Sequence, residues 1–290
     1  MAGIPDFCGR YFSLIILQPY SSYMKRVAGF MLLFLSAVSH AQNTRSLLVS
    51  ATFPKFLRNG DHLQIPVVIK TNLSLDLSGQ ANLQLTDATR KTSVDGWFNN
   101  VFPVQYFTSS FQSPAKLHFL LTVPDSFRTS LQMSIVCTSG LMSDTLQKLL
   151  PIVYYDHALI APVRDFDVSK TIYKKSGGAL VAPGGSADVY TGDTLVVKLM
   201  IRAAKTASGI VLTDALAATM KPVRPTGPGK FSETSVVVPI SNLEMGRHVY
   251  SYLVIAEHAG RFSFAPVTVK AGKEIESFDP GFILRVEAKP

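Results

Sequence analysis

Few residues of this sequence have the type and spacing that covalent catalysis requires. A catalytic triad needs a serine or cysteine near a histidine and an acid, and the turn pattern G-x-S-x-G that presents a nucleophilic serine does not occur. The six histidines are dispersed, without a pair at the two- or four-residue spacing of a local zinc site. Cys137, in LQMSIVCTSG, is expected to be a small buried side chain. We therefore expect no enzymatic activity, no cofactor and no catalytic or metal-binding residue.

Two segments have residue types that could bind an ion. YYDHALIAPVRDFD contains Asp156, His157, Asp165 and Asp167, and carboxylate and carbonyl oxygens are the ligands of Ca²⁺, although a solvated linker is the simpler interpretation. KKSGGALVAPGGSADVYTGD (174–193) is rich in glycine, but a phosphate-binding loop is followed by a helix, and here a strand pattern follows. We therefore expect a long hairpin connection at 174–193 and no nucleotide site.

A third segment is suited to contact rather than to chemistry. DGWFNNVFPVQYF carries Trp97, the only tryptophan, together with Phe98, Phe102 and Tyr106. Packing into the core is one interpretation of these rings. The other is a contact surface for a neighbouring domain or protein, because aromatic residues are enriched in the cores of interfaces.

The elements that must position these segments are strands. Alternating apolar and polar residues recur between turn signals such as Asn59-Gly60 and Pro124-Asp125. In the first half the runs are LLVSATF (47–53), LQIPVVIK (63–70), ANLQLTDA (81–88), KLHFLLTV (116–123) and LQMSIVCTS (131–139). In the second half they are 166–175, 194–203, 209–216, 234–241, 248–257, 260–271 and 282–289. Short strands at this spacing predict an all-β protein built as an antiparallel sandwich.

A Gly-Asp pair precedes a strand once in each half of the chain. Gly60-Asp61 leads into HLQIPVVIK, and Gly192-Asp193 leads into TLVVKLMI. Glycine can adopt a positive φ in such a turn, and the aspartate can accept hydrogen bonds from nearby backbone amides. Superposing the two pairs aligns Leu63, Ile65, Val67 and Ile69 with Leu195, Val197, Leu199 and Ile201. These positions alternate along a strand, so each set is expected to face a core.

The repeat predicts two tandem antiparallel β-sandwiches of related design. LQLTDA in the first half matches IVLTDAL in the second, which adds Asp214 to the shared framework. We place the first sandwich at 42–155, a linker at 156–165 and the second sandwich at 166–290. Pro66 and Pro239 interrupt two of the strand patterns and indicate edge strands or bulges, because proline cannot donate to a ladder.

The segment 1–41 has the layout of a leader and secretory signal peptide rather than of a folded domain. From Met24 it reads as a basic start with Lys25 and Arg26, an apolar helical run and small residues at 39–41. Residues 1–23 are interpreted as upstream of the true start, with Met1 as the alternative start. We expect export to the periplasm, the outer surface or the medium, and no membrane span.

The charge pattern argues against nucleic-acid binding. The net charge of the whole chain is +8, but the basic residues are scattered and the longest basic pair in the second half is Lys174-Lys175. A nucleic-acid surface normally shows a basic stripe or patch interleaved with aromatic residues.

Several segments in order resemble the bacterial alpha-2-macroglobulin family. FPKFLRNGDHLQIPVVIKTNLS, VDGWF, LTVPDSF and SDTLQKLLPI resemble its macroglobulin-type sandwich, and FDVSKTIYKK, YTGDTLVVKLMIRA, VLTDALAA and RHVYSYLVIAEHAGRFSFAPVTV are similar to its C-terminal macroglobulin domain. The likeness covers nearly all of the chain after the leader, and it lies in the order of the segments. It implies macroglobulin-like sandwiches with a strand framework that includes Gly60, Asp61, Gly192, Asp193 and Asp214.

The resemblance does not extend to the family's chemistry. Its large members are secreted or periplasmic protease traps with a cleavable bait segment, and many capture the protease through a thioester formed in a C-x-E-Q pattern. Here Cys137 is followed by Thr138, Ser139 and Gly140, so the pattern is missing. No bait-like segment occurs, and a short linker at 151–165 stands in place of the helical domain. No catalytic or thioester residue is therefore carried over.

From these observations we expect a non-enzymatic exported protein that acts by contact with another protein. The partner would be a protease or a companion macroglobulin chain in a protease-inhibiting assembly without thioester chemistry. The alternative is an independent surface or adhesion module that binds glycan, envelope or another protein through loops such as 95–107 or 174–193.

Overall fold

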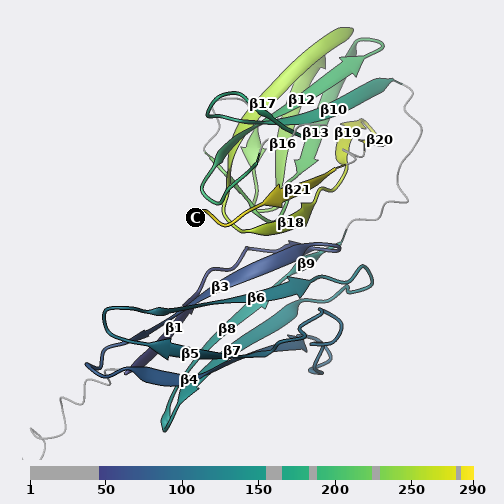
Figure 1. The fold of residues 1–290 in the computed structure, drawn as a ribbon. Coiled ribbons are helices and arrows are strands. Elements are labelled where there is room, and N and C mark those ends of the chain that lie inside the picture. The colour runs from purple at the N-terminus through teal and green to yellow at the C-terminus, as the bar shows by residue number, and fades with distance from the viewer. Residues whose placement is uncertain (1–45, 155–164, 183–187, 224–228, 279–281) are drawn as a thin grey trace, which may run out of the picture. The chain divides into compact units, whose positions relative to one another are not determined.

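All regular structure in the described residues is β-strand, as the alternating patterns predict. The computed structural model describes residues 46–154, 165–182, 188–223, 229–278 and 282–290, and within these ranges it has twenty-one strands and no helix (Figure 1). The predicted signal-peptide helix in 1–41 and most of the predicted linker lie outside the described residues. Nor do the described ranges contain a helix that could span a membrane. The all-β class is thus confirmed.

The strands of the first half are β1 (Leu47–Ala51), β2 (Leu57–Arg58), β3 (His62–Thr71), β4 (Leu77–Asp87), β5 (Val104–Ser109), β6 (Ala115–Thr122), β7 (Leu131–Ser139), β8 (Met142–Leu150) and β9 (Ile152–Val153). Those of the second half are β10 (Phe166–Lys174), β11 (Leu180–Ala182), β12 (Thr194–Ala203), β13 (Ala207–Ala215), β14 (Met220–Pro222), β15 (Lys230–Phe231), β16 (Ser235–Leu243), β17 (Gly246–Ala256), β18 (Gly260–Ser263), β19 (Val267–Ala271), β20 (Glu274–Phe278) and β21 (Ile283–Val286).

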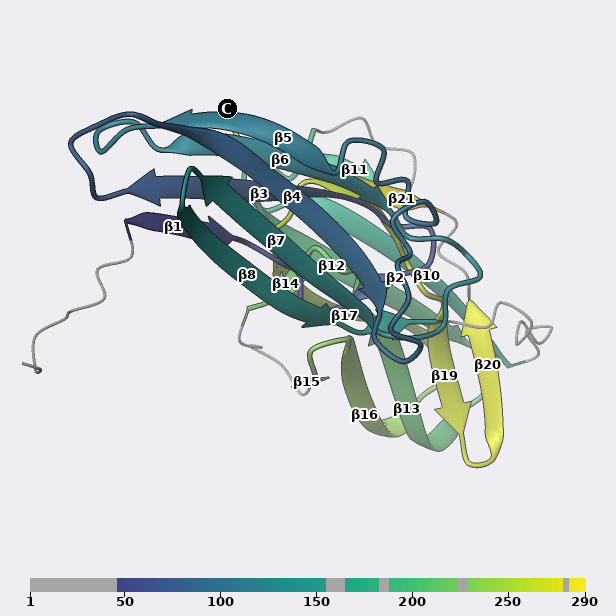
Figure 2. The same cartoon turned by 90° about the horizontal axis from the view of Figure 1, so that it is seen from below.

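The first sandwich has two antiparallel sheets. In one, β3 pairs with β6 along most of its length and with β1 over its second half. In the other, the strand order is β5-β4-β7-β8, and Figure 2 shows these strands side by side. The sheets bury the apolar positions that alternate along each strand, among them Leu63, Ile65, Val67 and Ile69 of β3 and Leu83, Leu85, Met133 and Ile135 of the facing sheet. The core is therefore made of the side chains that the alternation predicts.

The second sandwich repeats this plan with two five-stranded sheets. One has the order β11-β10-β12-β17-β14 and the other the order β15-β16-β13-β19-β20, and all of their pairings are antiparallel. The β12 residues that align with the core positions of β3 are Leu195, Val197, Leu199 and Ile201, and each is fully buried. The same periodicity thus places the same side-chain types in both cores.

A strand from the second half extends the sheet of the first half. β18 pairs with β21 and also with the start of β3, where Gly260 lies opposite Leu63. The Gln64 amide donates to the carbonyl oxygen of Ala259 at 3.1 Å, so the nitrogen of Pro66 faces the same side of β3. β1 reaches β3 only from Val67 onward. Pro66 therefore lies in an interior strand, contrary to the expected edge or bulge, at a gap between two partners where no donor is needed.

Pro239 lies where an edge proline is expected. It is in β16, opposite Val211 of β13, and no described strand pairs with its other side, because β15 pairs only with Val236 and Val237. A missing amide hydrogen at this position interrupts no ladder.

The two Gly-Asp turns have the same conformation and the same side-chain hydrogen bond. Gly60 has φ 78° and Gly192 has φ 92°, both in the left-handed region. The Arg58 amide donates to Asp61 Oδ2 at 2.8 Å, and the Tyr190 amide donates to Asp193 Oδ2 at 2.9 Å. Each carboxylate therefore closes a turn over the residue three positions before it.

The same backbone bonds anchor each turn to a neighbouring segment. In the first, the Gly60 amide donates to the carbonyl of Val123 at 3.0 Å, and the Val123 amide donates back to the carbonyl of Asp61 at 2.8 Å. In the second, Gly192 and Asp193 make the same exchange with Ala256, at 2.7 and 3.0 Å. The repeat read from the sequence is thus a repeat of local geometry.

Gly192→Ala is expected to lower the free energy of unfolding by about 1–2 kcal/mol, because an L side chain is strained at a positive φ. The added Cβ meets no atom within 4 Å, so a steric clash does not add to the effect. Gly96→Ala is the matched control, since its Cβ also meets open space and its φ is not positive. Urea denaturation measures both variants. Equal losses at the two positions would contradict a conformational role for Gly192.

Candidate functional site

The segment from Trp97 to Tyr106 exposes large apolar side chains to solvent. Trp97 is 57% exposed, Phe102 76% and Tyr106 80%, and Val101 and Val104 are exposed as well. We call these five residues the aromatic surface. They lie on the connection between β4 and β5 and on β5 itself, which is an edge strand of its sheet. Exposed rings gathered on a short segment are typical of a contact surface.

Phe98 does not belong to this surface, which corrects the sequence-based expectation. Its side chain is fully buried and packs edge-on against Phe127, with ring centroids 4.9 Å apart and an interplanar angle of 81°. Its carbonyl oxygen accepts a hydrogen bond from the Thr122 amide at 2.9 Å. Phe98 therefore anchors the segment to the core while its neighbours stay outside.

A polar network fixes the backbone between β4 and β5. Asp95 Oδ1 accepts hydrogen bonds from the Leu85 amide at 3.1 Å and from Asn100 Nδ2 at 2.8 Å. Asn100 Nδ2 also donates to the carbonyl of Leu83 at 3.1 Å. Asn99 adopts φ 54°, a conformation that asparagine tolerates better than most residues. The aromatic surface is therefore presented on an ordered loop.

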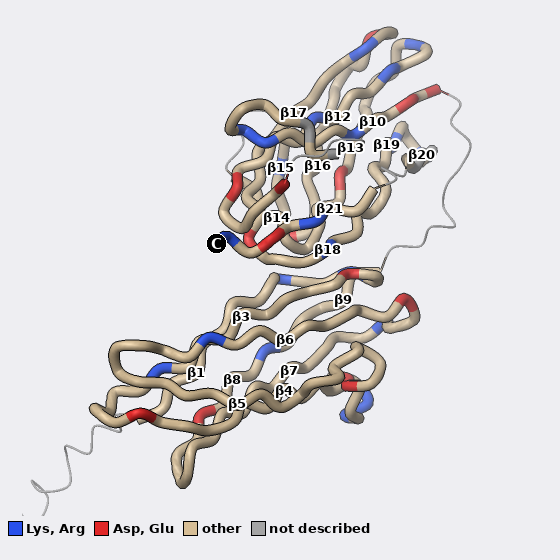
Figure 3. The backbone as a smooth tube through the Cα atoms, in the orientation of Figure 1, with Lys and Arg blue, Asp and Glu red and all other residues tan. Residues whose placement is uncertain are grey.

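The outer face of the sheet β5-β4-β7-β8 carries no charge. Strand alternation and pairing place its outward side chains in rows across the four strands. They are Val104, Tyr106 and Thr108 on β5; Ser78, Gln80, Asn82, Gln84 and Thr86 on β4; Gln132, Ser134, Val136 and Thr138 on β7; and Ser143, Thr145, Gln147 and Leu149 on β8. We call this set the neutral face. Figure 3 shows the corresponding lack of charged residues along most of β4, β5 and β7.

A shallow hollow of about 580 Å³ opens at one end of the neutral face. It is lined by Ser78, Gly79, Gln80, Tyr106, Phe107, Thr108, Thr138, Ser139 and Gly140. Three neighbouring strands thus contribute hydroxyl, amide and aromatic groups to one depression. The corresponding sheet of the second sandwich, which contains β13, differs, because the exposed Lys270 of β19 lies opposite Val211 on its outer face.

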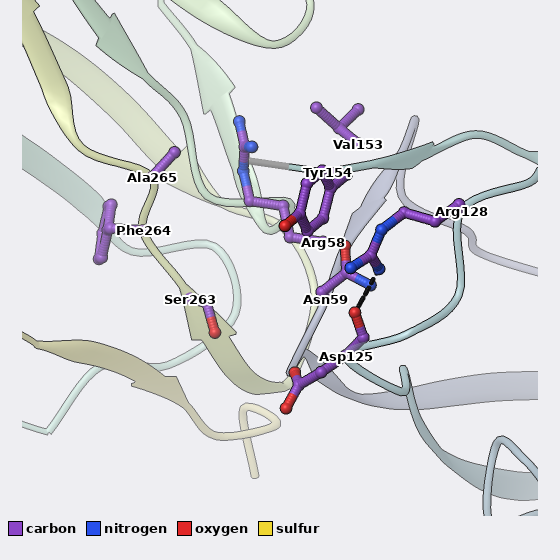
Figure 4. Close-up of a pocket in the computed structure, with 9 residues that line it drawn as sticks. All are labelled: Arg58, Asn59, Asp125, Arg128, Val153, Tyr154, Ser263, Phe264 and Ala265. Atoms are coloured by element: carbon purple, nitrogen blue, oxygen red, sulfur yellow. Dashed lines mark hydrogen bonds between the residues drawn. The ribbon is translucent and has the colours of Figure 1, made fainter. Parts of the chain in front are cut away.

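A second cavity, of about 330 Å³, lies beside the first Gly-Asp turn (Figure 4). Its lining residues are Arg58, Asn59, Asp125, Arg128, Val153, Tyr154, Ser263, Phe264 and Ala265. The Arg128 guanidinium stacks 3.6 Å from the Tyr154 ring centroid and donates to the backbone carbonyls of Asp125 and Phe127. Asn59 Nδ2 donates to three carbonyls of the same turn, including that of Pro124 at 2.8 Å. The polar side chains of this cavity are thus used in hydrogen bonds to backbone carbonyls, which indicates a structural role rather than a binding site.

Asp61 joins the first turn to β18. Its side chain is fully buried, and its Oδ1 accepts a hydrogen bond from the Ser263 amide at 2.9 Å. Burial raises the pKa of this carboxyl from 3.8 to about 7, although hydrogen bonds from the Ser263 and Arg58 amides oppose the rise. Arg58 itself is buried, and its Nε donates to the carbonyl of Leu216 at 3.0 Å.

Asp193 is more exposed to solvent than Asp61, its counterpart in the first turn. Burial alone would raise its pKa, but the Tyr190 amide and the Lys174 ammonium, 2.9 Å from Oδ2, lower that pKa overall. The equivalent aspartates thus have opposite pKa shifts because only Asp61 is shut away from solvent.

Asp214 belongs to a buried polar cluster that the sequence analysis missed. Lys170 Nζ lies 2.7 Å from Asp214 Oδ1, and the side chains are 1% and 0% exposed. The Tyr252 hydroxyl donates to Asp214 Oδ2 at 2.5 Å, and Lys170 Nζ lies 4.1 Å from the Phe264 ring centroid. Lys170 occupies a core-facing position in the alternating pattern of FDVSKTI, and this position could have revealed from the sequence that the lysine is buried.

Burial is the largest cause of the pKa shifts of Lys170 and Tyr252. It lowers the pKa of Lys170, against the opposing effect of the Asp214 carboxylate. Burial and the neighbouring carboxylate together raise the pKa of Tyr252 well above 10. The tyrosine therefore remains a proton donor at neutral pH.

The two LTDA segments use their aspartates differently. Asp87 Oδ1 accepts hydrogen bonds from the amides of Thr89 and Arg90 at 2.8 and 3.0 Å, which caps a turn. Asp214 instead directs both carboxylate oxygens at side chains of the second core. The same LTDA sequence therefore forms a local turn in one sandwich and a contact between the two sheets in the other.

No metal-binding cluster of three or more His, Cys, Asp or Glu side chains is found among the described residues. Of the acidic segment considered above, Asp165 pairs with Lys205 at 2.8 Å, while Asp156 and His157 lie outside the described residues. Cys137 is buried, and burial raises the pKa of its thiol to about 11.

Comparison of the sequence with protein-family models and with curated proteins found no match. Solved structures similar to the chain include Escherichia coli alpha-2-macroglobulin from domain MG7 to the C-terminus, at 12% identity over 71% of this chain and TM-score 0.37, and the elastase-activated form, at 12% over 73% and TM-score 0.40. A putative membrane-anchored protein from Corynebacterium diphtheriae is 11% identical over 84%, with TM-score 0.34. The chain spans 33%, 19% and 59% of these proteins, respectively.

The pKa of Asp61 predicts a specific pH dependence of stability. Between pH 3.8 and about 7 the unfolded chain ionises this carboxyl while the folded chain keeps it protonated. The stabilisation that comes from keeping this carboxyl protonated is therefore complete below pH 3.8 and is lost as the pH rises through about 7. The free energy of unfolding falls by at most about 4 kcal/mol over this range.

Asp61→Asn removes this titration and should flatten the fall in stability between pH 4 and 7, whatever its effect on absolute stability. Denaturation midpoints of the wild type and the variant across this range test the expectation, with Asp193→Asn as the control at the equivalent turn. Parallel pH profiles for the wild type and Asp61→Asn would show that Asp61 titrates normally.

Proposed function

We propose that this is a non-enzymatic exported protein that works by contact with another protein, as an abridged relative of bacterial alpha-2-macroglobulin. Its partner would be an endopeptidase, held within an inhibiting assembly that uses no thioester. The observation that carries the proposal is the aromatic surface, in which Trp97, Phe102 and Tyr106 are more than half exposed on an ordered segment.

The energetic argument concerns apolar area. Covering exposed apolar surface contributes about 25 cal/mol per Å², and tryptophan and tyrosine are frequent hot spots in protein interfaces. The anchored loop lowers the conformational entropy that binding would cost, because Phe98 and Asn100 already fix the backbone. A preorganised apolar surface is therefore suited to docking against another folded protein.

Non-covalent contact is also the mode that the cysteine chemistry supports. Cys137 is buried in β7 with a raised pKa, and the residues after it do not form the C-x-E-Q pattern of a thioester. A thiolate is the reactive form of cysteine, so burial makes this thiol a packing residue.

The double variant Trp97→Ala/Phe102→Ala is expected to weaken endopeptidase binding at least about tenfold, since each truncated hot spot costs on the order of 1–2 kcal/mol. The measurements are complex formation by size-exclusion chromatography and protection of a protein substrate from a panel of secreted endopeptidases. Phe111→Ala is the matched control, because Phe111 is 68% exposed but lies beyond the other end of β5. The proposal fails if no endopeptidase forms a complex or is inhibited.

The neutral face favours a second candidate function, an adhesion module that binds a neutral glycan. Sugar hydroxyls can exchange hydrogen bonds with the amide and hydroxyl side chains there, and the exposed Tyr106 ring borders the hollow as an apolar platform. No side chain of this face is charged, so a neutral glycan could bind there without removing water from an ionised group.

Gln80→Ala and Tyr106→Ala should each abolish retardation of the protein in native gels that contain a neutral β-glucan, if this second function is correct. Thr171→Ala, on the outward side of β10 in the second sandwich, should leave mobility unchanged. Equal mobility of the wild-type protein with and without a series of neutral polysaccharides would exclude the glycan function. Retardation that survives both substitutions would place binding elsewhere.

A further inference from the structure

We propose that Lys170 and Asp214 are joined by an intramolecular isopeptide bond, formed between Lys170 Nζ and Asp214 Cγ inside the second sandwich. The inference is independent of the proposed binding function. It assigns a covalent modification to a side-chain pair whose atoms already lie 2.7 Å apart in the core.

The position of the pair would make such a bond a link between sheets. Lys170 is on β10, in the sheet β11-β10-β12-β17-β14, and Asp214 is on β13, in the facing sheet. The side chains are 1% and 0% exposed, so bulk water does not surround the carboxyl carbon. The fold already holds the Lys170 amine against the Asp214 carboxyl, so the two groups need not meet by diffusion. Such positioning is among the largest sources of rate acceleration.

The environment favours the neutral forms that amide formation needs. A buried ion pair has a high desolvation cost, and transfer of one proton from Nζ to Oδ1 along the existing hydrogen bond gives an amine and a carboxylic acid. The Phe264 ring covers Nζ at 4.1 Å, and the positive charge of Arg58 lowers the pKa of Lys170 further. The nitrogen lone pair then becomes available to attack Cγ.

Tyr252 supplies the proton donor for the step. Its hydroxyl donates to Asp214 Oδ2, where it polarises the carboxyl group as negative charge develops on the oxygen. The C–N bond forms, one C–O bond breaks, and the departing hydroxyl leaves as water with a proton from the nitrogen. No oxidant, reductant or co-reactant is needed, and Tyr252 ends as it began.

The same chain contains a matched pair in which the reaction is not expected. Lys174 Nζ lies 2.9 Å from Asp193 Oδ2, but those side chains are 21% and 27% exposed. Partial exposure lets solvent stabilise the separated charges of this pair, and the Asp193 carboxylate also accepts a hydrogen bond from the Tyr190 amide. Distance alone therefore does not distinguish the two pairs, whereas burial does.

The test is the mass of the purified exported protein with its N-terminus determined by sequencing. We expect a mass lower than the calculated one by one water molecule. Tryptic digestion should yield peptide 165–174, uncut after Lys170, joined to peptide 206–230, while cleavage after Lys174 proceeds normally. Lys170→Arg and Asp214→Ala should restore the calculated mass, and Tyr252→Phe should leave a large fraction of the chains unlinked.

The unmodified mass of the wild-type protein, with free cleavage after Lys170, would overturn the proposal without reliance on any variant. A loss of water that maps to another pair of residues would overturn it as well. Failure of the protein to bind an endopeptidase or a glycan has no bearing on this result.

Discussion

Two buried or half-buried carboxylates, Asp61 and Asp193, close the turns from which the central strands β3 and β12 start. Because side chains alternate along a strand, the residue at which a strand starts decides which face every later side chain occupies. A shift by one position would turn the apolar set of β3 outward and expose it. The hydrogen bonds of each turn therefore set the register on which both cores depend.

The sequence indicated those features that follow from short-range pattern. Alternation identified most of the long strands, but it missed β5, β8 and β20, and the run predicted at 260–271 is two strands, β18 and β19, in different sheets. It also identified core positions such as Ile65 and Val197, and the repeated Gly-Asp pair pointed to equivalent turns. The ring of Phe98 could not be told from that of Phe102, because loops lack the period that separates inward from outward positions. Only the tertiary fold, which packs Phe98 on Phe127, distinguishes them.

Features made by distant residues could not be read from the chain. The neutral face is assembled from four strands whose pairing is not given by any one segment. Lys170 stood at an inward position, but its partners Asp214 and Tyr252 lie 44 and more residues away along the sequence. Pro66 suggested an edge because the gap between β18 and β1 depends on a strand from the far half of the chain.

β18, the strand of the second half that pairs with β3, affects the order in which the molecule folds. Ser263, which donates its amide to Asp61, is 202 residues further along the chain, and Gly260 lies opposite Leu63. Contacts of such high sequence separation form late, after a large loss of loop entropy. β6 pairs with one side of the start of β3, but the other side gains its partner β18 only after nearly the whole polypeptide has been synthesised. A chain truncated before residue 260 would keep this sheet edge open and able to pair with another copy.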